Sequence, residues 1–195
     1  KLVRAIEVAN WHLTTGFLGT PYLLFALSDN GRTDVAYRLL MNETYPSWGY
    51  MVKNGATTWW ERWNSDKSDP TMNSFNHYAF GSVVEWMYRS MAGINTTPEA
   101  PGFKKIIIRP NFDESGKITH SKCHYTSMYG EITSQWTVVS DKKVQLKITV
   151  PANTSASVQL PANALIADEN IARTKNGNTL ELGSGAYEFT VLLQN

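Results

Sequence analysis

Glu61 lies among tryptophans in residues 55–64, which read Gly-Ala-Thr-Thr-Trp-Trp-Glu-Arg-Trp-Asn. Aromatic faces cover the apolar C–H surface of a sugar ring, and a carboxylate in such a setting can take a proton from an attacking water. The segment therefore suggests a sugar site with Glu61 as its base. Two other interpretations stay open: a Thr58-x-x-Glu61 capping box at the start of a helix, and a surface pair of Glu61 with Arg62.

His77 is a second candidate. It lies within Ser74-Phe75-Asn76-His77-Tyr78, in the expected first turn of a long apolar helix, where the helix N-terminus favours a neutral imidazole that can donate or accept a hydrogen bond. A core role for this single histidine remains open, and His12 is a weaker candidate of the same kind. His120 and His124 are four residues apart in an expected strand with no third ligand nearby, so we expect no metal site there.

The remaining sequence excludes several classes of function. It contains no nucleophilic serine elbow, phosphate loop, dinucleotide fingerprint or zinc spacing. The net charge is +1 without long basic clusters, which excludes a nucleic-acid surface. No apolar run approaches the roughly 18 residues of a membrane-spanning helix, and the single Cys123 is expected to be inert. We expect a soluble protein without cofactor or metal, and among enzymes an acid–base hydrolase.

Helices must position these residues in the first half of the chain. Thr20-Pro21 and Asp29-Asn30-Gly31 delimit one helix, and Thr33 caps a second over residues 34–43, so that the two form a hairpin. A third start signal occurs at Thr57-Thr58. Asn73-Ser74 should cap a long helix that runs to about Ala92 and ends at Gly93.

After Pro98 the hydrophobic period changes from helical to two residues, which predicts strands. Six of the seven tryptophans precede Pro98, so the two halves should have different cores, with domains at residues 1–98 and 99–195. The expected strands cover residues 103–109, 118–127, 131–140, 142–150, 155–160 and 187–193, and a hairpin turn is expected at Asn176-Gly177-Asn178. Short strands with polar turns indicate an antiparallel β-sandwich.

Four motifs closely resemble the C-terminal part of bacterial α-L-rhamnosidases of glycoside hydrolase family 78, and they occur in that family's order. They span residues 11–20, 46–51, 55–63 and 74–79. The resemblance covers nearly all of residues 1–110, and the β half looks like the family's C-terminal sandwich. It implies that residues 1–98 are part of a six-hairpin (α/α)6 barrel, and that residues 99–195 are the sandwich domain.

The resemblance also implies an inverting hydrolase that removes terminal α-L-rhamnose from rhamnosides. In that mechanism one carboxylic acid protonates the leaving oxygen and a second carboxylate activates water. Glu61 matches the general base and His77 a residue that contacts the sugar, while Trp48 or Trp60 would wall the pocket. The family's general acid lies upstream of the residues present here. We therefore expect the missing N-terminal part of the same polypeptide as a partner, and residues 1–195 alone to be inactive.

Other interpretations remain. The chain begins without methionine, as if in the middle of a helix, which suggests a fragment of a longer bacterial protein of the cytoplasm or periplasm. The sandwich could be structural or could bind carbohydrate, with aromatic candidates that could equally be core residues: Tyr125, Tyr129, Trp136 and Tyr187. The α half could also belong to another inverting α/α-barrel glycosidase or phosphorylase.

Overall fold

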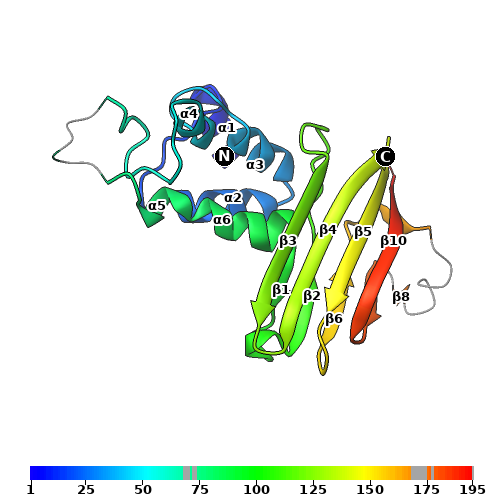
Figure 1. The fold of residues 1–195 in the computed structure, drawn as a ribbon. Coiled ribbons are helices and arrows are strands. Elements are labelled where there is room, and N and C mark those ends of the chain that lie inside the picture. The colour runs from blue at the N-terminus through cyan, green and yellow to red at the C-terminus, as the bar shows by residue number, and fades with distance from the viewer. Residues whose placement is uncertain (68–70, 72–73, 168–174, 177, 195) are drawn as a thin grey trace. The chain divides into compact units, whose positions relative to one another are not determined.

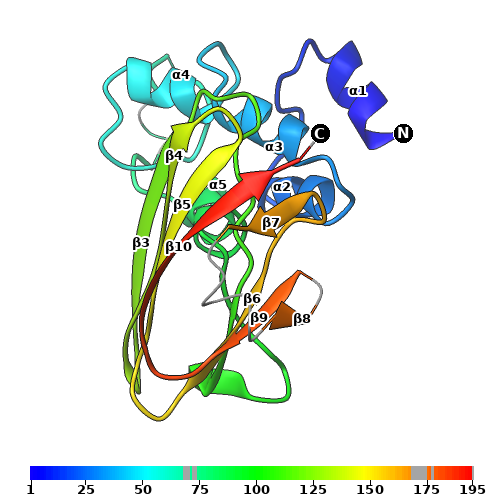
Figure 2. The same cartoon turned by 90° about the vertical axis from the view of Figure 1, so that its right-hand side faces the viewer.

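A computed structural model describes residues 1–67, 71, 74–167, 175–176 and 178–194 (Figures 1 and 2). The chain forms two compact units, Lys1–Trp86 and Met87–Asn195, here called the helical unit and the sheet unit. The domain boundary that the sequence suggests at residue 98 stays a prediction. In the structure, strand β1 (Ile94–Thr96), which precedes that residue, already pairs within the sheet unit.

The helical unit is built on a hairpin of two helices whose apolar sides pack together. Proline at the first turn favours the start of α2, and Leu23, Leu24 and Leu27 are buried on it. Val35 and Leu39 are buried on α3, so the predicted hairpin is confirmed, although α3 starts at Thr33 and ends at Leu40. The helices are α1 (Leu2–Val8), α2 (Thr20–Ser28), α3 (Thr33–Leu40), α4 (Trp48–Lys53), α5 (Tyr78–Gly81) and α6 (Val83–Trp86).

Two helix predictions are wrong. No helix starts at Thr57-Thr58, because residues 56–64 form loops and turns. The long helix does not start at Ser74 either, and Asn73 lies outside the described residues. It begins at Tyr78 and is interrupted at Ser82, whose hydroxyl donates to the Ala79 carbonyl (2.6 Å) and competes with regular helical pairing. Met87–Met91 then form a π-helical turn within the sheet unit.

The sheet unit holds two five-stranded sheets, in the orders β1-β2-β6-β9-β8 and β3-β4-β5-β10-β7 (Figure 2). The pairings in the described residues are antiparallel, apart from the parallel pair β2 and β6. The predicted helical part followed by antiparallel-rich sheets is thus confirmed, whereas Gly177 of the expected hairpin turn lies outside the described residues. The remaining strands are β2 (Lys105–Ile108), β3 (His120–Ser127), β4 (Gly130–Ser140), β5 (Lys143–Val150), β6 (Ser155–Gln159), β7 (Ala164–Ile166), β8 (Lys175–Asn176), β9 (Thr179–Leu182) and β10 (Gly185–Leu193).

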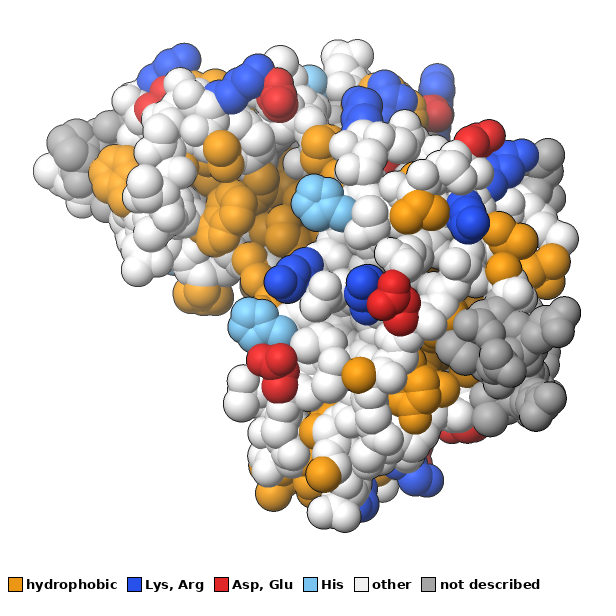
Figure 3. All heavy atoms as spheres, turned by 45° about the vertical axis from the view of Figure 1, so that its right-hand side comes forward, with side chains coloured by type: hydrophobic (Ala, Val, Ile, Leu, Met, Phe, Trp, Pro, Cys, Tyr) orange, Lys and Arg blue, Asp and Glu red, His pale blue; other side chains and the backbone are white. Residues whose placement is uncertain are grey.

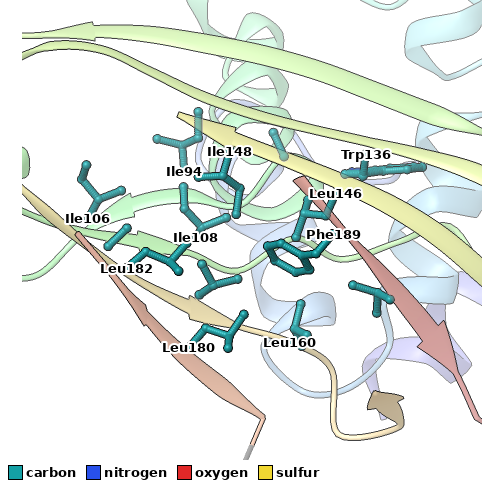
Figure 4. Packing of buried hydrophobic residues seen from close by; sticks show 14 of the residues in the cluster. Ile94, Ile106, Ile108, Trp136, Leu146, Ile148, Leu160, Leu180, Leu182 and Phe189 are labelled. Carbon is teal, nitrogen blue, oxygen red and sulfur yellow. The ribbon is translucent and has the colours of Figure 1, made fainter. Parts of the chain in front are cut away.

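Buried side chains from both sheets form the core of this unit (Figure 4). Trp136, Leu146 and Phe189 lie side by side across β4, β5 and β10, as alternation along each strand requires. The Trp136 indole N–H donates to the Met91 carbonyl at 2.9 Å. Of the four aromatic residues considered for carbohydrate binding, Trp136 is therefore a core residue, while Tyr125 is exposed and packs on Phe103.

Candidate active site

Glu61 is held by Ser74, a residue from a distant part of the chain. The Glu61 backbone N–H donates to the Ser74 carbonyl, and the Ser74 N–H donates to Glu61 Oε2, each at 2.8 Å. The Thr58 hydroxyl donates to the Phe75 carbonyl, so the capping box between Thr58 and Glu61 is wrong. These bonds fix both the backbone and the carboxylate of Glu61 in a loop that contains no helix.

The same pairing sets the segment of Glu61 beside the segment of His77. The His77 N–H donates to the Trp59 carbonyl at 2.8 Å, so residues 58–61 run beside residues 74–77. The local fold thus places the two residues that the sequence nominated as base and sugar contact on adjacent segments.

Glu61 lines an open cavity of about 410 Å³ in the helical unit. This volume falls within the range of about 300–1,000 Å³ that is common for small-molecule sites. Three stretches form its walls: residues 13–17, residues 45–46 and residues 61–64, with Phe80 added from α5. Glu61 is the carboxylate among the described residues that line the cavity.

His77 caps α5 through its ring. Its Nδ1 accepts the Ala79 backbone N–H at 3.2 Å, which leaves Nε2 to carry the proton of the neutral imidazole. The ring stacks with Phe17 and with Tyr78, each at a centroid separation of 4.9 Å. With Nδ1 engaged by the backbone, His77 can act on a ligand through its Nε2–H, as a hydrogen-bond donor.

Trp48 and Trp60 lie behind the surface of this cavity. Trp48 is 2% exposed and donates its indole N–H to the Phe80 carbonyl at 2.9 Å. Trp60 is 5% exposed and packs edge-on against Phe75 at 5.9 Å. In the described structure, neither residue is part of the cavity lining.

Trp63 and Phe80 form the aromatic wall in their place. Their rings stack at 3.8 Å with an interplanar angle of 22°, and both line the cavity together with Phe17 and Tyr45. Sequence reasoning did not assign these residues to the site. A signal existed for Trp63, which is two positions from Glu61, and for Phe17, which follows the Thr14-Thr15-Gly16 segment. A helix that started at Thr57-Thr58 would instead turn Trp63 to a different face from Glu61.

The described residues hold no group of three or more His, Cys, Asp or Glu side chains that could bind a metal ion. His120 and His124 are both exposed on β3. In the part of the chain that the structure describes, no helix has the length and apolar character needed to cross a membrane. The cavity lining itself offers the Glu61 carboxylate, the polar side chains of Arg62 and Asn64, and aromatic faces. His77 is not among the lining residues, but its ring stacks on Phe17, which is.

Comparison with protein families matches both units. Residues 1–91 match the model of the bacterial α-L-rhamnosidase six-hairpin glycosidase domain. Residues 93–172 match the model of the bacterial α-L-rhamnosidase C-terminal domain. An α-L-rhamnosidase of Streptomyces avermitilis is 45% identical over 201 residues, which cover 98% of this chain and 19% of that protein. An α-L-rhamnosidase of an Alteromonas species is 41% identical over 99% of this chain and 21% of that protein.

Solved structures agree with the sequence comparison. The α-L-rhamnosidase of Streptomyces avermitilis, solved with L-rhamnose, superposes with a TM-score of 0.82 at 43% identity, covering 96% of this chain and 19% of that one. The α-L-rhamnosidase from Dictyoglumus thermophilum gives 0.84 at 34% identity, covering 98% and 22%. The chain thus spans about a fifth of the length of these relatives. On these matches, which cover both of its units, the chain belongs to the bacterial α-L-rhamnosidase family.

Proposed function

We propose that this chain supplies the general base and part of the sugar pocket of an inverting α-L-rhamnosidase, which removes terminal α-L-rhamnose from rhamnosides. One observation carries the proposal: Glu61 is anchored by Ser74 at the surface of a cavity with aromatic walls. The solved relative that contains L-rhamnose supports the choice of sugar. Aromatic rings such as Trp63 and Phe80 suit the apolar face of a deoxy sugar.

In this proposal Glu61 takes a proton from the water that attacks the anomeric carbon. An inverting mechanism needs that water held on the face of the sugar opposite the leaving group. The Ser74 N–H binds Oε2 and restricts rotation of the carboxylate, so that Oε1 is the oxygen proposed to accept the water's proton. A base fixed in this way loses little orientational entropy when the water binds.

His77 is proposed to donate its Nε2–H to a sugar oxygen. The Nδ1 bond to Ala79 fixes the tautomer, and the stack with Phe17 and Tyr78 fixes the plane of the ring. Trp60 and Trp48 remain part of the proposed substrate site, but as buried supporting residues. Trp48 packs behind Trp63 and Phe80 and is proposed to hold them in position. Trp60 packs on Phe75 and is proposed to hold the segment next to Glu61.

The proposal includes a partner, namely a further segment of the same polypeptide that carries the general acid. Inversion requires two carboxyl groups about 6.5–9.5 Å apart, and Glu61 is the carboxylate that lines the cavity in the described residues. The relatives are about five times longer than the matched region, which leaves room for the second group elsewhere. Residues 1–195 alone are therefore proposed not to hydrolyse rhamnosides.

The test uses p-nitrophenyl α-L-rhamnoside with three proteins: the full-length enzyme that carries this chain, its Glu61→Gln variant, and residues 1–195 alone. Glutamine keeps the shape of the side chain but cannot take the proton, so kcat should fall by about 10²–10⁴. Glu99→Gln, at an exposed position in the sheet unit, is the matched control and should leave kcat unchanged. Proton NMR of the first-formed product should show the inverted anomer.

Three results would contradict the proposal. Retained turnover in the Glu61→Gln variant would remove this carboxylate from the mechanism. Robust hydrolysis by residues 1–195 would remove the need for a second segment. Formation of the retained anomer would contradict the role of Glu61 as a base that activates water directly.

A further inference from the structure

Hydrogen bonds join the segments that lead into two walls of the cavity, and the residues that make these bonds are not part of the cavity lining. One wall, residues 13–17, follows directly after Trp11 and His12. The other wall, residues 45–46, follows directly after Asn42 and Thr44. Asn42 Nδ2 donates to the Trp11 carbonyl and His12 Nε2 lies against Thr44 Oγ1, each at 2.8 Å.

The direction of the bonds to Asn42 follows from the atoms involved. The amide oxygen of Asn42 can only accept, so the Thr44 hydroxyl donates its single proton to Asn42 Oδ1 at 2.8 Å. The His12 ring bonds to the Thr44 hydroxyl through Nε2 and to the Ala9 carbonyl through Nδ1 (3.3 Å), and the tautomer of the ring sets which nitrogen donates. The Thr44 backbone N–H also donates to Asn42 Oδ1 (2.9 Å), which fixes the orientation of the amide. The result is a chain of hydrogen bonds, here called the relay, that links His12, Thr44, Asn42 and the Trp11 carbonyl.

The segment that the relay holds has a strained backbone. Asn10 and Trp11 have φ values of 52° and 62°, in the left-handed region that residues other than glycine rarely adopt. The Trp11 ring is covered by the Arg38 guanidinium, whose carbon lies 3.5 Å from the ring centroid. Such a conformation persists only where neighbouring contacts over-determine it. Arg38, Asn42 and Thr44 together supply those contacts, all from α3 and the loop that follows it.

We propose that Asn42 and Thr44 are positioning residues that set the separation of the two walls, and through it the affinity of the cavity for sugar. Neither residue lines the cavity, so both act through residues 13–17 and 45–46. This inference rests on the proposed function, because it assumes that sugar binds in this cavity. Glu61 lies on another wall and is anchored independently by Ser74. Loss of the relay therefore weakens sugar binding and leaves the base in place.

The test compares Thr44→Val, which keeps the shape and removes the hydroxyl, with Thr44→Ser, which keeps the hydroxyl. In the full-length enzyme, Thr44→Val should raise KM for p-nitrophenyl α-L-rhamnoside and Kd for L-rhamnose by about three- to tenfold, the effect of about one lost hydrogen bond. Turnover at saturation should stay within about twofold, because the base is untouched. Thr44→Ser should restore wild-type values. Thr137→Val, at an exposed position of β4, is the matched control and should change neither constant.

A double-mutant cycle isolates the relay. If His12 acts through Thr44, then the variant with His12→Ala and Thr44→Val together should have a KM no higher than the worse single variant. Additive effects of the two substitutions would overturn the relay. Lower thermal stability with unchanged KM and Kd would overturn it too, because a merely structural role predicts that result. Equal KM and Kd values for Thr44→Val and Thr44→Ser would also overturn the relay, because only the serine variant keeps the hydroxyl.

The affinity for L-rhamnose separates this inference from the function on which it rests. If the wild-type enzyme fails to bind L-rhamnose, the sugar pocket itself is wrong. If the wild type binds and Thr44→Val binds equally well, only the positioning role is wrong. If the Glu61→Gln variant keeps its turnover, Glu61 is not the base. The Kd values for L-rhamnose would still test the relay, because they do not depend on that assignment.

Discussion

Trp48 and Trp63 contact each other edge-on at 5.5 Å, yet they have different tasks. Trp63 lines the cavity and stacks on Phe80, whereas Trp48 is buried and donates to the Phe80 carbonyl. Substitution of an aromatic residue that lines the cavity should change the affinity for a ligand bound there. Substitution of a buried aromatic residue should change the free energy of unfolding. The two tryptophans can therefore be told apart by measuring both quantities.

We predict that Trp48→Phe lowers the free energy of unfolding by about 1–3 kcal/mol, because the buried Phe80 carbonyl loses its donor and the smaller ring leaves unfilled volume. Urea unfolding of the 195-residue chain, followed by circular dichroism, measures this change. Trp63→Phe is the comparison. In the full-length enzyme it should reduce the free energy of L-rhamnose binding by more than it reduces the free energy of unfolding. Weakened binding by Trp48→Phe at unchanged stability would show instead that Trp48 faces the sugar.

Residue type suggested a chemistry for Glu61, whereas spacing gave the wrong geometry for its segment. A carboxylate among tryptophans indicated a sugar site, but spacing suggested a helix with Thr58 as its cap. The bonds that decide the geometry come from Ser74, which is separated from Glu61 by 13 positions. A pairing of this kind leaves no local signal, so it can only be seen in the folded chain. The assignment of Glu61 as base stays a prediction.

At the scale of elements, the long strands were predicted well and the short ones were missed. Strand β5 alternates buried and less buried residues along its whole length. Strands β3, β4, β5 and β10 are also long and bounded by turn residues, so the sequence alone locates them. The strands that were missed span four residues or fewer: β1, β7, β8 and β9. Strands β7 and β9 pair with β10 and β6, which are distant in sequence, whereas β8 pairs with the adjacent β9. In such segments tertiary pairing decides the structure, and local propensity carries too little information.

Strand β1 owes its position to Gly93. A side-chain carbon at Gly93 would lie 2.3 Å from backbone atoms of Arg109 and Pro110, and the backbone there has φ of +85°. The Gly93 carbonyl also accepts the Arg109 N–H at 2.9 Å, next to the pair Ile94 and Ile108. The close approach of these two backbones therefore needs glycine both for conformation and for space.

We predict that Gly93→Ala lowers the free energy of unfolding by more than about 3 kcal/mol, since left-handed strain and a backbone clash add together. Gly116→Ala is the matched control in the same unit, with φ of +71° and open space around it. It should cost about 1–2 kcal/mol, from left-handed strain alone. Urea unfolding of both variants measures the difference. If the Gly93→Ala variant cannot be obtained in folded form while the Gly116→Ala variant can, the clash is confirmed. Equal losses in the free energy of unfolding would exclude the clash.

At the scale of the whole molecule, large apolar side chains are exposed unevenly between the two units. Leu18 and Tyr22 of the helical unit are 89% and 72% exposed, and Val8 and Tyr78 are comparably open. In the described part of the sheet unit, Met128 alone reaches a similar value, 83%. Figure 3 shows apolar side chains gathered on one face of the helical unit. Contiguous exposed apolar surface of this kind usually marks a face that is covered by another protein surface.

We predict that the isolated 195-residue chain self-associates through the helical unit as its concentration rises. Tyr22 lies in the first turn of α2 and Leu18 in the turn that precedes this helix, and both side chains are largely exposed. Substitution of both residues by serine should shift the chain toward monomer in sedimentation velocity runs over a concentration series. Met128→Ser removes a side chain of similar exposure from the sheet unit and should leave the association unchanged. A wild-type chain that stays monomeric throughout, or an equal effect of Met128→Ser, would mean that exposed apolar area in the helical unit does not govern association.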